Sequence, residues 1–189
     1  MIGVLLVGVG GQGTLTAARI LGEAAHAAGL PVRLGQLHGM SQRGGSVRGT
    51  VLLGPGQGAF LPGRGADVVI ALEPLELMRC RDSLHAGSRV VVSSGRIAPS
   101  SLAQSGRDYP DIEGFFEELR PQIAELVVVD GPALAGGSRG LNVALLGVLA
   151  DRGWLPFGAE AIVGALEAFG AHRESNRRVF EAGRKTTQR

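Results

Sequence analysis

Two glycine-rich segments hold the residue types in this sequence that suit binding of an anionic group. The first is GVGGQG at residues 8–13, which fits Gly-x-Gly-x-x-Gly through Gly8, Gly10 and Gly13. Such a turn lets the backbone approach a ligand closely, and the helix behind it offers free N–H donors and partial positive charge. Thr14 could add a hydroxyl or cap that helix. A tight strand-to-helix turn without a ligand is the alternative.

The second segment, HGMSQRGGSVRG at residues 38–49, is long, polar and positively charged. A plain turn needs about four residues with one or two glycines. Arg43 has the planar donor fork that suits carboxylate or phosphate, and Gly44-Gly45 lets the backbone pass close to a ligand or adopt positive φ. Further polar groups are supplied by His38, Ser41, Gln42 and Ser46. Together they favour a binding or subunit-docking surface, although each alone is compatible with a hairpin turn, an ion pair or an ordinary loop histidine.

Several reaction classes lack their motifs in this sequence. It contains no Gly-x-Ser-x-Gly, His-Glu-x-x-His or Gly-Lys-Ser/Thr motif and no acidic metal cluster. A dinucleotide enzyme needs an Asp or Glu after its second strand to hold the ribose, yet no acid lies between Glu23 and Asp67. Arg33 could meet a 2′-phosphate, but it lies early in that strand. These absences argue against catalysis by this chain alone.

Two further polar residues have open roles. Glu73 follows the apolar run DVVIAL, and it could either reach the same crevice as the glycine segments or stabilise the start of the next helix. Asn142 lies near the start of a later helical pattern, where capping is its simplest role.

Composition fits one packed α/β domain. The 189 residues are 44% hydrophobic but only 4% aromatic, so Val, Leu, Ile and Ala must form the core. The net charge is +2 and acids lie between most of the arginines, so we expect no nucleic-acid binding. The single cysteine, Cys80, excludes an internal disulfide or an iron–sulfur cluster held by this chain alone, and we expect a structural thiol. The apolar N-terminus is too short to span a bilayer and lacks a signal peptide's basic start, so we expect a cytoplasmic protein without membrane contact.

Strand and helix patterns alternate along the chain. Short apolar runs predict strands at residues 2–7, 31–37, 46–54, 66–74, 88–94 and 127–131. Helical spacing predicts helices at 14–29, with Gly29 as the C-cap, and at 74–87, 112–126 with an interruption at Pro121, 138–153, 157–170 and 172–186.

The alternation indicates an α/β fold, a three-layer Rossmann-like open sheet that is mostly parallel and has helices on both faces. Strand 46–54 follows its neighbour without a helix, so an antiparallel pair there would make the sheet mixed. We expect a single domain over residues 1–189 whose C-terminal helices occupy about 138–186.

At GVGGQGTLTAARIL and HGMSQRGGSV the sequence resembles the gamma-type subunit or domain of the 2-oxoacid:ferredoxin oxidoreductases, the pyruvate/ketoisovalerate oxidoreductase gamma type. Within that family it is most similar to the small (beta) subunit of indolepyruvate ferredoxin oxidoreductase. The stretches ALEPLE and GLNVALLGVLA support the resemblance, as do Asn176, Phe180 and Gly183. The resemblance covers essentially the whole chain.

The resemblance implies a heteromeric complex that oxidatively decarboxylates a 2-oxoacid, here indolepyruvate or another arylpyruvate, to an acyl-CoA. Thiamine diphosphate and the iron–sulfur clusters would belong to a large partner subunit, ferredoxin would take the electrons, and coenzyme A would be the cosubstrate. This chain would bind no cofactor alone but would help form the active site or coenzyme A pocket. The resemblance implies no metal ligand and assigns no catalytic residue in this chain. The residues that would form its wall of that site are Gly10, Gly11, Gln12, Gly13, Thr14, His38, Ser41, Gln42, Arg43, Gly44, Gly45 and Ser46.

The alternative is a stand-alone Rossmann-like oxidoreductase or binding module that takes a nucleotide or flavin by itself. A homodimer of the isolated chain also stays open, because a subunit without its partner leaves apolar surface exposed.

Overall fold

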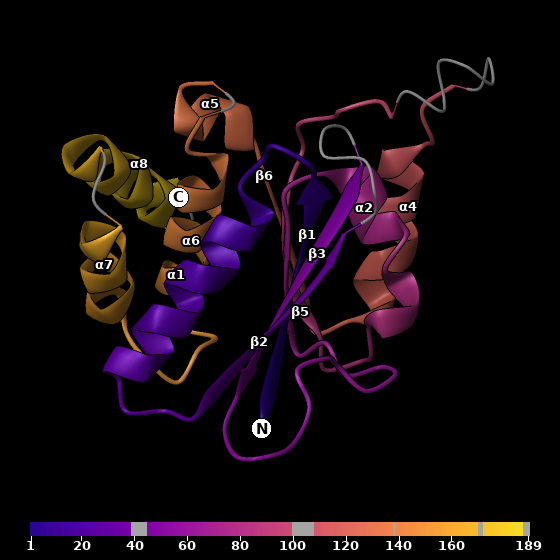
Figure 1. Ribbon diagram of the computed structural model, residues 1–189. Helices are drawn as coiled ribbons and strands as arrows, with labels where there is room; N and C mark the ends of the chain where they lie inside the picture. Colours follow the sequence, from indigo (N-terminus) through magenta and orange to yellow (C-terminus); the bar gives the residue numbers. More distant parts are fainter. Residues whose placement is uncertain (39–44, 100–107, 138, 170–171, 187–189) are drawn as a thin grey trace.

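The computed structural model describes residues 1–38, 45–99, 108–137, 139–169 and 172–186 (Figure 1). At its centre lies a six-stranded sheet of order β2-β3-β1-β4-β5-β6. Strand β3 runs antiparallel to both β1 and β2, whereas β1, β4, β5 and β6 are parallel. The expected mixed, mostly parallel α/β sheet is therefore confirmed. The strands are β1 Ile2–Val9, β2 Val32–His38, β3 Ser46–Leu53, β4 Val68–Ala71, β5 Arg89–Ser93 and β6 Glu125–Val129.

Helices cover both faces of this sheet, as Figure 1 shows. One face is covered by α1 Thr14–Ala27, α6 Leu141–Arg152, α7 Ala159–Ala168 and α8 Arg173–Thr186. On the other face lie α2 Pro74–Met78 and α4 Ile112–Leu119, and the short α5 Gly131–Ala135 follows β6. Two 3-10 turns, η1 Arg81–Ser83 and η2 Arg120–Gln122, complete the described elements.

Each face of the sheet has its own apolar core. In β1, Val4 and Leu6 pack with α1 and α6, while Leu5 and Val7 pack with α2 and α4. This strict alternation follows from the period of two along a strand. β4 follows the same pattern, with Val68 and Ile70 in the first core and Val69 and Ala71 in the second. Each fully buried aliphatic side chain of these strands contributes about 1.5–3 kcal/mol.

Helix α1 ends at Ala27, so its C-cap lies one residue before the predicted Gly29. Ala28 is the C-cap, its N–H donates to Ala24 O, and Gly29 follows in the left-handed conformation with φ 73°. Small residues on the buried side of the helix let it lie close to the sheet, where Gly49 of β3 faces Ala18.

The predicted boundaries around α2 and α4 were wrong. The helix expected over 74–87 ends at Met78 and continues as η1, because Cys80 and Leu84 both turn into the core beside α4. The helix expected over 112–126 ends at Leu119, and β6 begins at Glu125 so that Leu126 enters the same core.

Helix α5 had no predicted counterpart, although the sequence contains its signal. Asp130 is its N-cap, and Oδ1 accepts from Ala133 N–H at 3.0 Å. Pro132 lies in the first turn, where its missing N–H costs no hydrogen bond.

Candidate functional site

The two glycine-rich segments meet at the carboxyl edge of the sheet, next to a change of chain direction. From β1 the chain runs through α1 toward β2, whereas from β4 it runs through α2 toward β5, on the opposite side. In open α/β sheets ligands bind beyond the carboxyl ends of the strands at such a point. The turn at 8–13 follows β1, and β2 is parallel to β1, so residues 38–46 start from the same edge.

A backbone hydrogen bond joins the two segments directly. Gly10 N–H donates to Gly45 O at 2.8 Å, and Val9 is paired with Ser46 in the β1–β3 register. His38 closes β2 opposite Val47. Four of the expected site residues, Ser41, Gln42, Arg43 and Gly44, lie outside the described residues.

Gln12 spans the gap between the ends of β1 and β4. Its Oε1 accepts from Val9 N–H at 2.7 Å, and its Nε2 donates to Leu72 O at 3.0 Å. Gly8 is required beneath it, because a Cβ at Gly8 would lie 2.9 Å from Gln12 Oε1 and 2.7 Å from Thr14 Oγ1. The amide therefore fills this part of the crevice with both of its polar atoms hydrogen bonded.

Thr14 is the first residue of α1, but it does not cap the helix. The N-cap is Gly13, in the left-handed conformation with φ 82° and without a side-chain hydrogen bond. Thr14 is only 2% exposed, and within the described residues its Oγ1 has no hydrogen-bond partner. Of the two roles open for Thr14, capping was wrong, and its hydroxyl lies against Gly8 under the turn.

Asn142 reaches the same turn from the far end of the sequence. It is buried in the first turn of α6, whose N-cap is Gly140 without a side-chain cap, so the predicted capping role was wrong. Instead, Asn142 Nδ2 donates to Gly13 O at 3.2 Å. No local sequence signal could reveal this contact, because the two residues are 129 positions apart.

On the other side of the edge, Glu73 supports the helix that follows β4. It is fully buried and is the N-cap of α2, where its Oε2 accepts from Glu76 N–H at 3.0 Å. Its Oε1 accepts from Ile97 N–H at 3.2 Å and from the Tyr109 hydroxyl. Burial and this bond to Glu73 raise the pKa of the Tyr109 phenol. Of the two roles open for Glu73, support of the helix start is confirmed.

Glu76, which sequence reasoning had not singled out, fixes Ser46. The Ser46 hydroxyl donates to Glu76 Oε2 at 2.5 Å, and Arg79 Nη1 lies 2.6 Å from Oε1. Glu76 is buried, so these two partners satisfy its charge where water cannot. The available signal was its position three residues after the N-cap Glu73.

Cys80 lies behind Glu76 as a buried thiol. Its burial, with a smaller contribution from Glu76, raises the pKa of the thiol to about 11, against the opposing effect of Arg48 and Arg79. A thiol of this kind is neutral at physiological pH and inert, which agrees with a structural role.

Metal-ligand clusters and long apolar helices are both absent from the described part of the chain. There, no group of three or more His, Cys, Asp or Glu side chains could hold a metal ion. None of its helices is long and apolar enough to cross a bilayer.

Comparison with known proteins gives the family. The family model described as pyruvate ferredoxin/flavodoxin oxidoreductase matches residues 3–186. The chain therefore belongs to that family, and the resemblance inferred from the two glycine segments is confirmed. A curated relative, indolepyruvate oxidoreductase subunit IorB of Archaeoglobus fulgidus, is 36% identical over 168 residues, which is 87% of this chain and 84% of the relative.

Two solved structures share the fold. The gamma subunit of a keto/oxoacid ferredoxin oxidoreductase from Geobacter sulfurreducens matches with a TM-score of 0.67 and 21% identity, over 100% of this chain and 99% of that chain. The 2-oxoglutarate:ferredoxin oxidoreductase of Magnetococcus marinus, with 2-oxoglutarate, coenzyme A and succinyl-CoA bound, matches with a TM-score of 0.74 and 17% identity. That match covers 99% of this chain but 31% of the neighbour, so the fold occurs there as one part of a longer chain.

Proposed function

We propose that this chain is the small subunit of a cytoplasmic 2-oxoacid:ferredoxin oxidoreductase that acts on indolepyruvate or another arylpyruvate. The family match over residues 3–186 carries the proposal, and the identity to an indolepyruvate oxidoreductase subunit supports the substrate class. In the overall reaction the 2-oxoacid loses CO2, its acyl group passes to coenzyme A, and ferredoxin takes the electrons. Thiamine diphosphate would stabilise the carbanion formed on decarboxylation, and iron–sulfur clusters would carry the electrons away.

The residues of this chain do not fit an iron–sulfur cluster. Iron–sulfur clusters are held by several thiolates, whereas the chain has only Cys80, which is buried and has a raised pKa. The proposal therefore places the clusters and thiamine diphosphate on a large partner subunit. It gives this chain no step of electron transfer.

What this chain would contribute is one wall of the site that receives substrate or coenzyme A. The hydrogen bond from Gly10 to Gly45 supports this role, because it brings the first glycine turn next to Gly45 at the carboxyl edge of the sheet, where ligands bind in open α/β sheets. The start of α1 brings partial positive charge to that edge, and Arg43 would add a full charge suited to carboxylate or phosphate. The proposed wall is the set Gly10, Gly11, Gln12, Gly13, Thr14, His38, Ser41, Gln42, Arg43, Gly44, Gly45 and Ser46.

Within that wall the described side chains have positioning roles. Gln12 holds the turn to Leu72, and Ser46 is held by Glu76. A rigid turn keeps its outward N–H groups in one geometry, which lowers the entropic cost of binding an anion there. Gln12 also stands in the crevice that a stand-alone dinucleotide enzyme would need to keep open.

Co-expression with the large subunit tests this function. The assay follows indolepyruvate- and phenylpyruvate-dependent reduction of a viologen dye, with and without this chain and with and without coenzyme A. Activity that requires both chains and coenzyme A is the expected result. No association and no activity, together with tight binding of a nucleotide or flavin by the isolated chain, would establish the stand-alone module instead.

A single substitution tests the proposed wall. We expect Arg43→Ala to lower turnover of the complex at least tenfold, since loss of a site cation costs more than about 1.4 kcal/mol in the barrier. Arg178→Ala on the exposed side of α8 is the matched control and should leave turnover unchanged. Equal turnover in the two variants would remove Arg43 from the site.

A further inference from the structure

Among the described elements, no helix covers one part of the sheet on the side of α2 and α4. There α2 packs against β1, β4 and β5. In the described part of the chain, β2 and β3 are crossed on this face by residues 54–65 instead. That segment is fixed by a hydrogen bond of 2.6 Å from Thr50 Oγ1 to Ala59 O, and Gly35 leaves room for it, since a Cβ there would lie 2.2 Å from Ala59 O.

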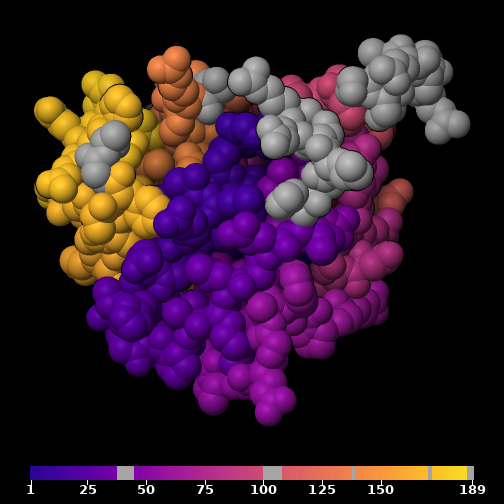
Figure 2. Space-filling model, viewed as in Figure 1, coloured from indigo at the N-terminus to yellow at the C-terminus, as the bar shows by residue number. Residues whose placement is uncertain are grey.

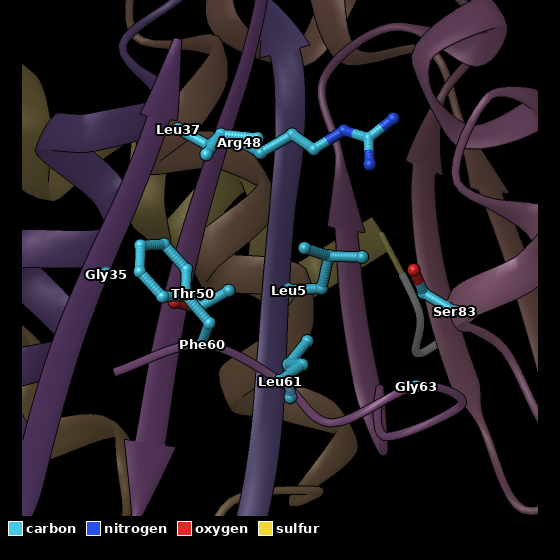
Figure 3. Close-up of a pocket in the computed structure, with 9 residues that line it drawn as sticks. All are labelled: Leu5, Gly35, Leu37, Arg48, Thr50, Phe60, Leu61, Gly63 and Ser83. Atoms are coloured by element: carbon cyan, nitrogen blue, oxygen red, sulfur yellow. The ribbon is translucent and has the colours of Figure 1, made fainter. Parts of the chain in front are cut away.

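A shallow pocket lies between this segment and the strands (Figure 3). Its volume is about 140 Å³, whereas sites for cofactors and similar ligands measure roughly 300–1,000 Å³. A pocket of this size fits one inserted side chain. In Figure 3, Phe60 lies in front of Thr50, and Arg48 extends from β3 across β1. Its described lining is Leu5, Gly35, Leu37, Arg48, Thr50, Phe60, Leu61, Gly63 and Ser83.

The rim of this pocket is apolar and exposed. The fractional exposure of Leu37 is 60% and that of Phe60 is 58%, which places both among the most exposed large apolar residues of the described chain. Large apolar side chains around a small pocket are typical of the anchor region of a protein interface. Exposure of Leu37 and Phe60 to water does not stabilise a monomer, and clustered exposed apolar side chains indicate an interaction site.

The charge of this face is positive. Arg48 is the only charged residue in the described lining, and within the described residues it has no ion pair, only a bond from Nη2 to Arg79 O at 3.3 Å. Arg33 shares the side of β2 that presents Gly35 and Leu37, and Arg64 follows Gly63 of the lining. Because no Asp or Glu occurs between residues 23 and 67, β2, β3 and the crossing segment have no negative charge of their own.

Strand β2 adds an open edge to the same face. In the described sheet its only neighbour is β3, so the backbone groups on its other side are unpaired within the sheet. The strand VRLGQLH contains no lysine or proline that would block pairing. In Figure 2, purple residues, the colour of β2 and β3, lie uncovered in the middle of the face in view.

We propose that this face, defined by Arg33, Leu37, Arg48, Phe60 and Arg64, docks the large partner subunit through a surface that offers an apolar side chain flanked by carboxylates. The proposal rests on the proposed function, which supplies a partner. Charge decides against a second copy as the occupant. A symmetric dimer would set this face against itself and bring its arginines together, and like charges at an interface cost several kcal/mol.

Affinity between the two purified subunits tests the docking face. The variants are Phe60→Asp and Arg48→Glu, with Arg48→Lys as the version that keeps the charge and Arg178→Glu as the control on α8. Circular dichroism and thermal melts establish that each variant is folded. We expect Phe60→Asp and Arg48→Glu to weaken Kd at least tenfold, Arg178→Glu to match the wild type, and Arg48→Lys to retain most of the affinity. The wild-type affinity should also fall with added salt, and less so in Arg48→Glu.

Three results would overturn the proposal. Kd within twofold of the wild type in both folded variants would show that the partner binds elsewhere. A wild-type dimer in sedimentation, abolished by Phe60→Asp without any effect on Kd for the large subunit, would make a second copy the occupant. Failure of the wild-type chain to bind the large subunit at all would remove the proposed function itself, a result distinct from loss in the variants alone.

Discussion

Asn142 and Gly13 are 129 positions apart in sequence, yet Asn142 Nδ2 donates to Gly13 O at 3.2 Å. The bond fixes the start of α1 against the start of α6, and it does so at the residue where the glycine turn becomes a helix. Two features of position 13 require glycine. Its φ of 82° disfavours other residues, and a Cβ there would lie 2.7 Å from Asn142 Nδ2.

Replacement of Gly13 should therefore cost more than the backbone conformation alone explains. Gly29→Ala is the matched control, because Gly29 has a similar φ of 73° but nothing within 4 Å of an added Cβ. Each substitution should lose about 1–2 kcal/mol through left-handed strain. We expect Gly13→Ala to lose roughly 1–3 kcal/mol more through overpacking against Asn142.

Urea denaturation of both variants measures the difference. The double variant Gly13→Ala/Asn142→Ala should recover part of the extra loss, because neighbouring residues are not additive. Equal free energies of unfolding for Gly13→Ala and Gly29→Ala would show that the Asn142 side chain moves away from the added Cβ without destabilising the fold.

Replacement of Gln12 by Glu should make the stability of the fold depend on pH. Gln12→Glu keeps an oxygen that accepts from Val9 N–H but loses the donor to Leu72 O, so it should cost about 1–2 kcal/mol at neutral pH. Next to a carbonyl the new carboxyl prefers to be protonated, which raises its pKa in the folded state. Its protonated form restores a donor, so the deficit should shrink as the pH falls through the raised folded pKa, be smallest below about 4, the ordinary pKa of Glu, and return as the pH rises through the folded pKa.

The comparison with Gln12→Ala separates the two bonds. That variant loses both hydrogen bonds and has no titratable group, so its deficit should not depend on pH between acid and neutral conditions. Thermal melts of the three proteins over this range provide the measurement. A pH-independent deficit in Gln12→Glu would mean that its side chain has turned to solvent.

The parts of this fold that the sequence predicts are those set by interactions between residues close together in the chain. The strands were predicted because their apolar runs are local patterns; β1 and β4, for example, were located within two or three residues. The antiparallel β2–β3 pair was anticipated from the missing helix between them. Where tertiary burial overrides local propensity, as at Cys80 after α2, the predicted helix was too long.

The side-chain contacts of the site were mostly beyond prediction. The proximity of Gly10 and Gly45 could be anticipated, because parallel strands end at one edge. The partners Asn142 and Glu76 could not, since each reaches its segment across the sheet edge from a distant part of the chain. Local patterns contain no information about which distant polar groups satisfy one another.

Tyr109 provides a spectroscopic test of the buried Glu73 carboxylate. The chain has one tyrosine, so its ultraviolet titration reports on Tyr109 alone. Burial and the bond to Glu73 raise the phenol pKa, and we therefore expect no ionisation near pH 10 while the protein is folded. With a raised folded pKa, this group stabilises the fold below the ordinary tyrosine pKa, and that contribution is lost as the pH rises above it.

Two variants separate the causes of that shift. Glu73→Gln removes the charge and should bring the phenol pKa back toward its ordinary value. Among the described residues, Tyr109→Phe leaves Glu73 Oε1 with the Ile97 N–H as its one partner, and it should cost about 1–3 kcal/mol in chemical denaturation. A tyrosine that titrates near pH 10 in the folded wild-type protein would contradict the contact.

Cys80 should behave as an inert thiol until the protein unfolds. Burial raises its pKa from 9.0 to about 11, which leaves about a hundredfold less thiolate at pH 8 than in the unfolded chain. We expect the reaction with 5,5′-dithiobis(2-nitrobenzoate) to be at least a hundredfold slower in the native protein than in urea. Because the folded pKa is raised, the neutral thiol stabilises the fold below about pH 9, and this contribution is lost as the pH rises through about 11. Cys80→Ala should flatten that alkaline loss at a cost of about 1 kcal/mol from the small cavity, and rapid labelling of the native thiol at pH 8 would show instead that Cys80 is accessible.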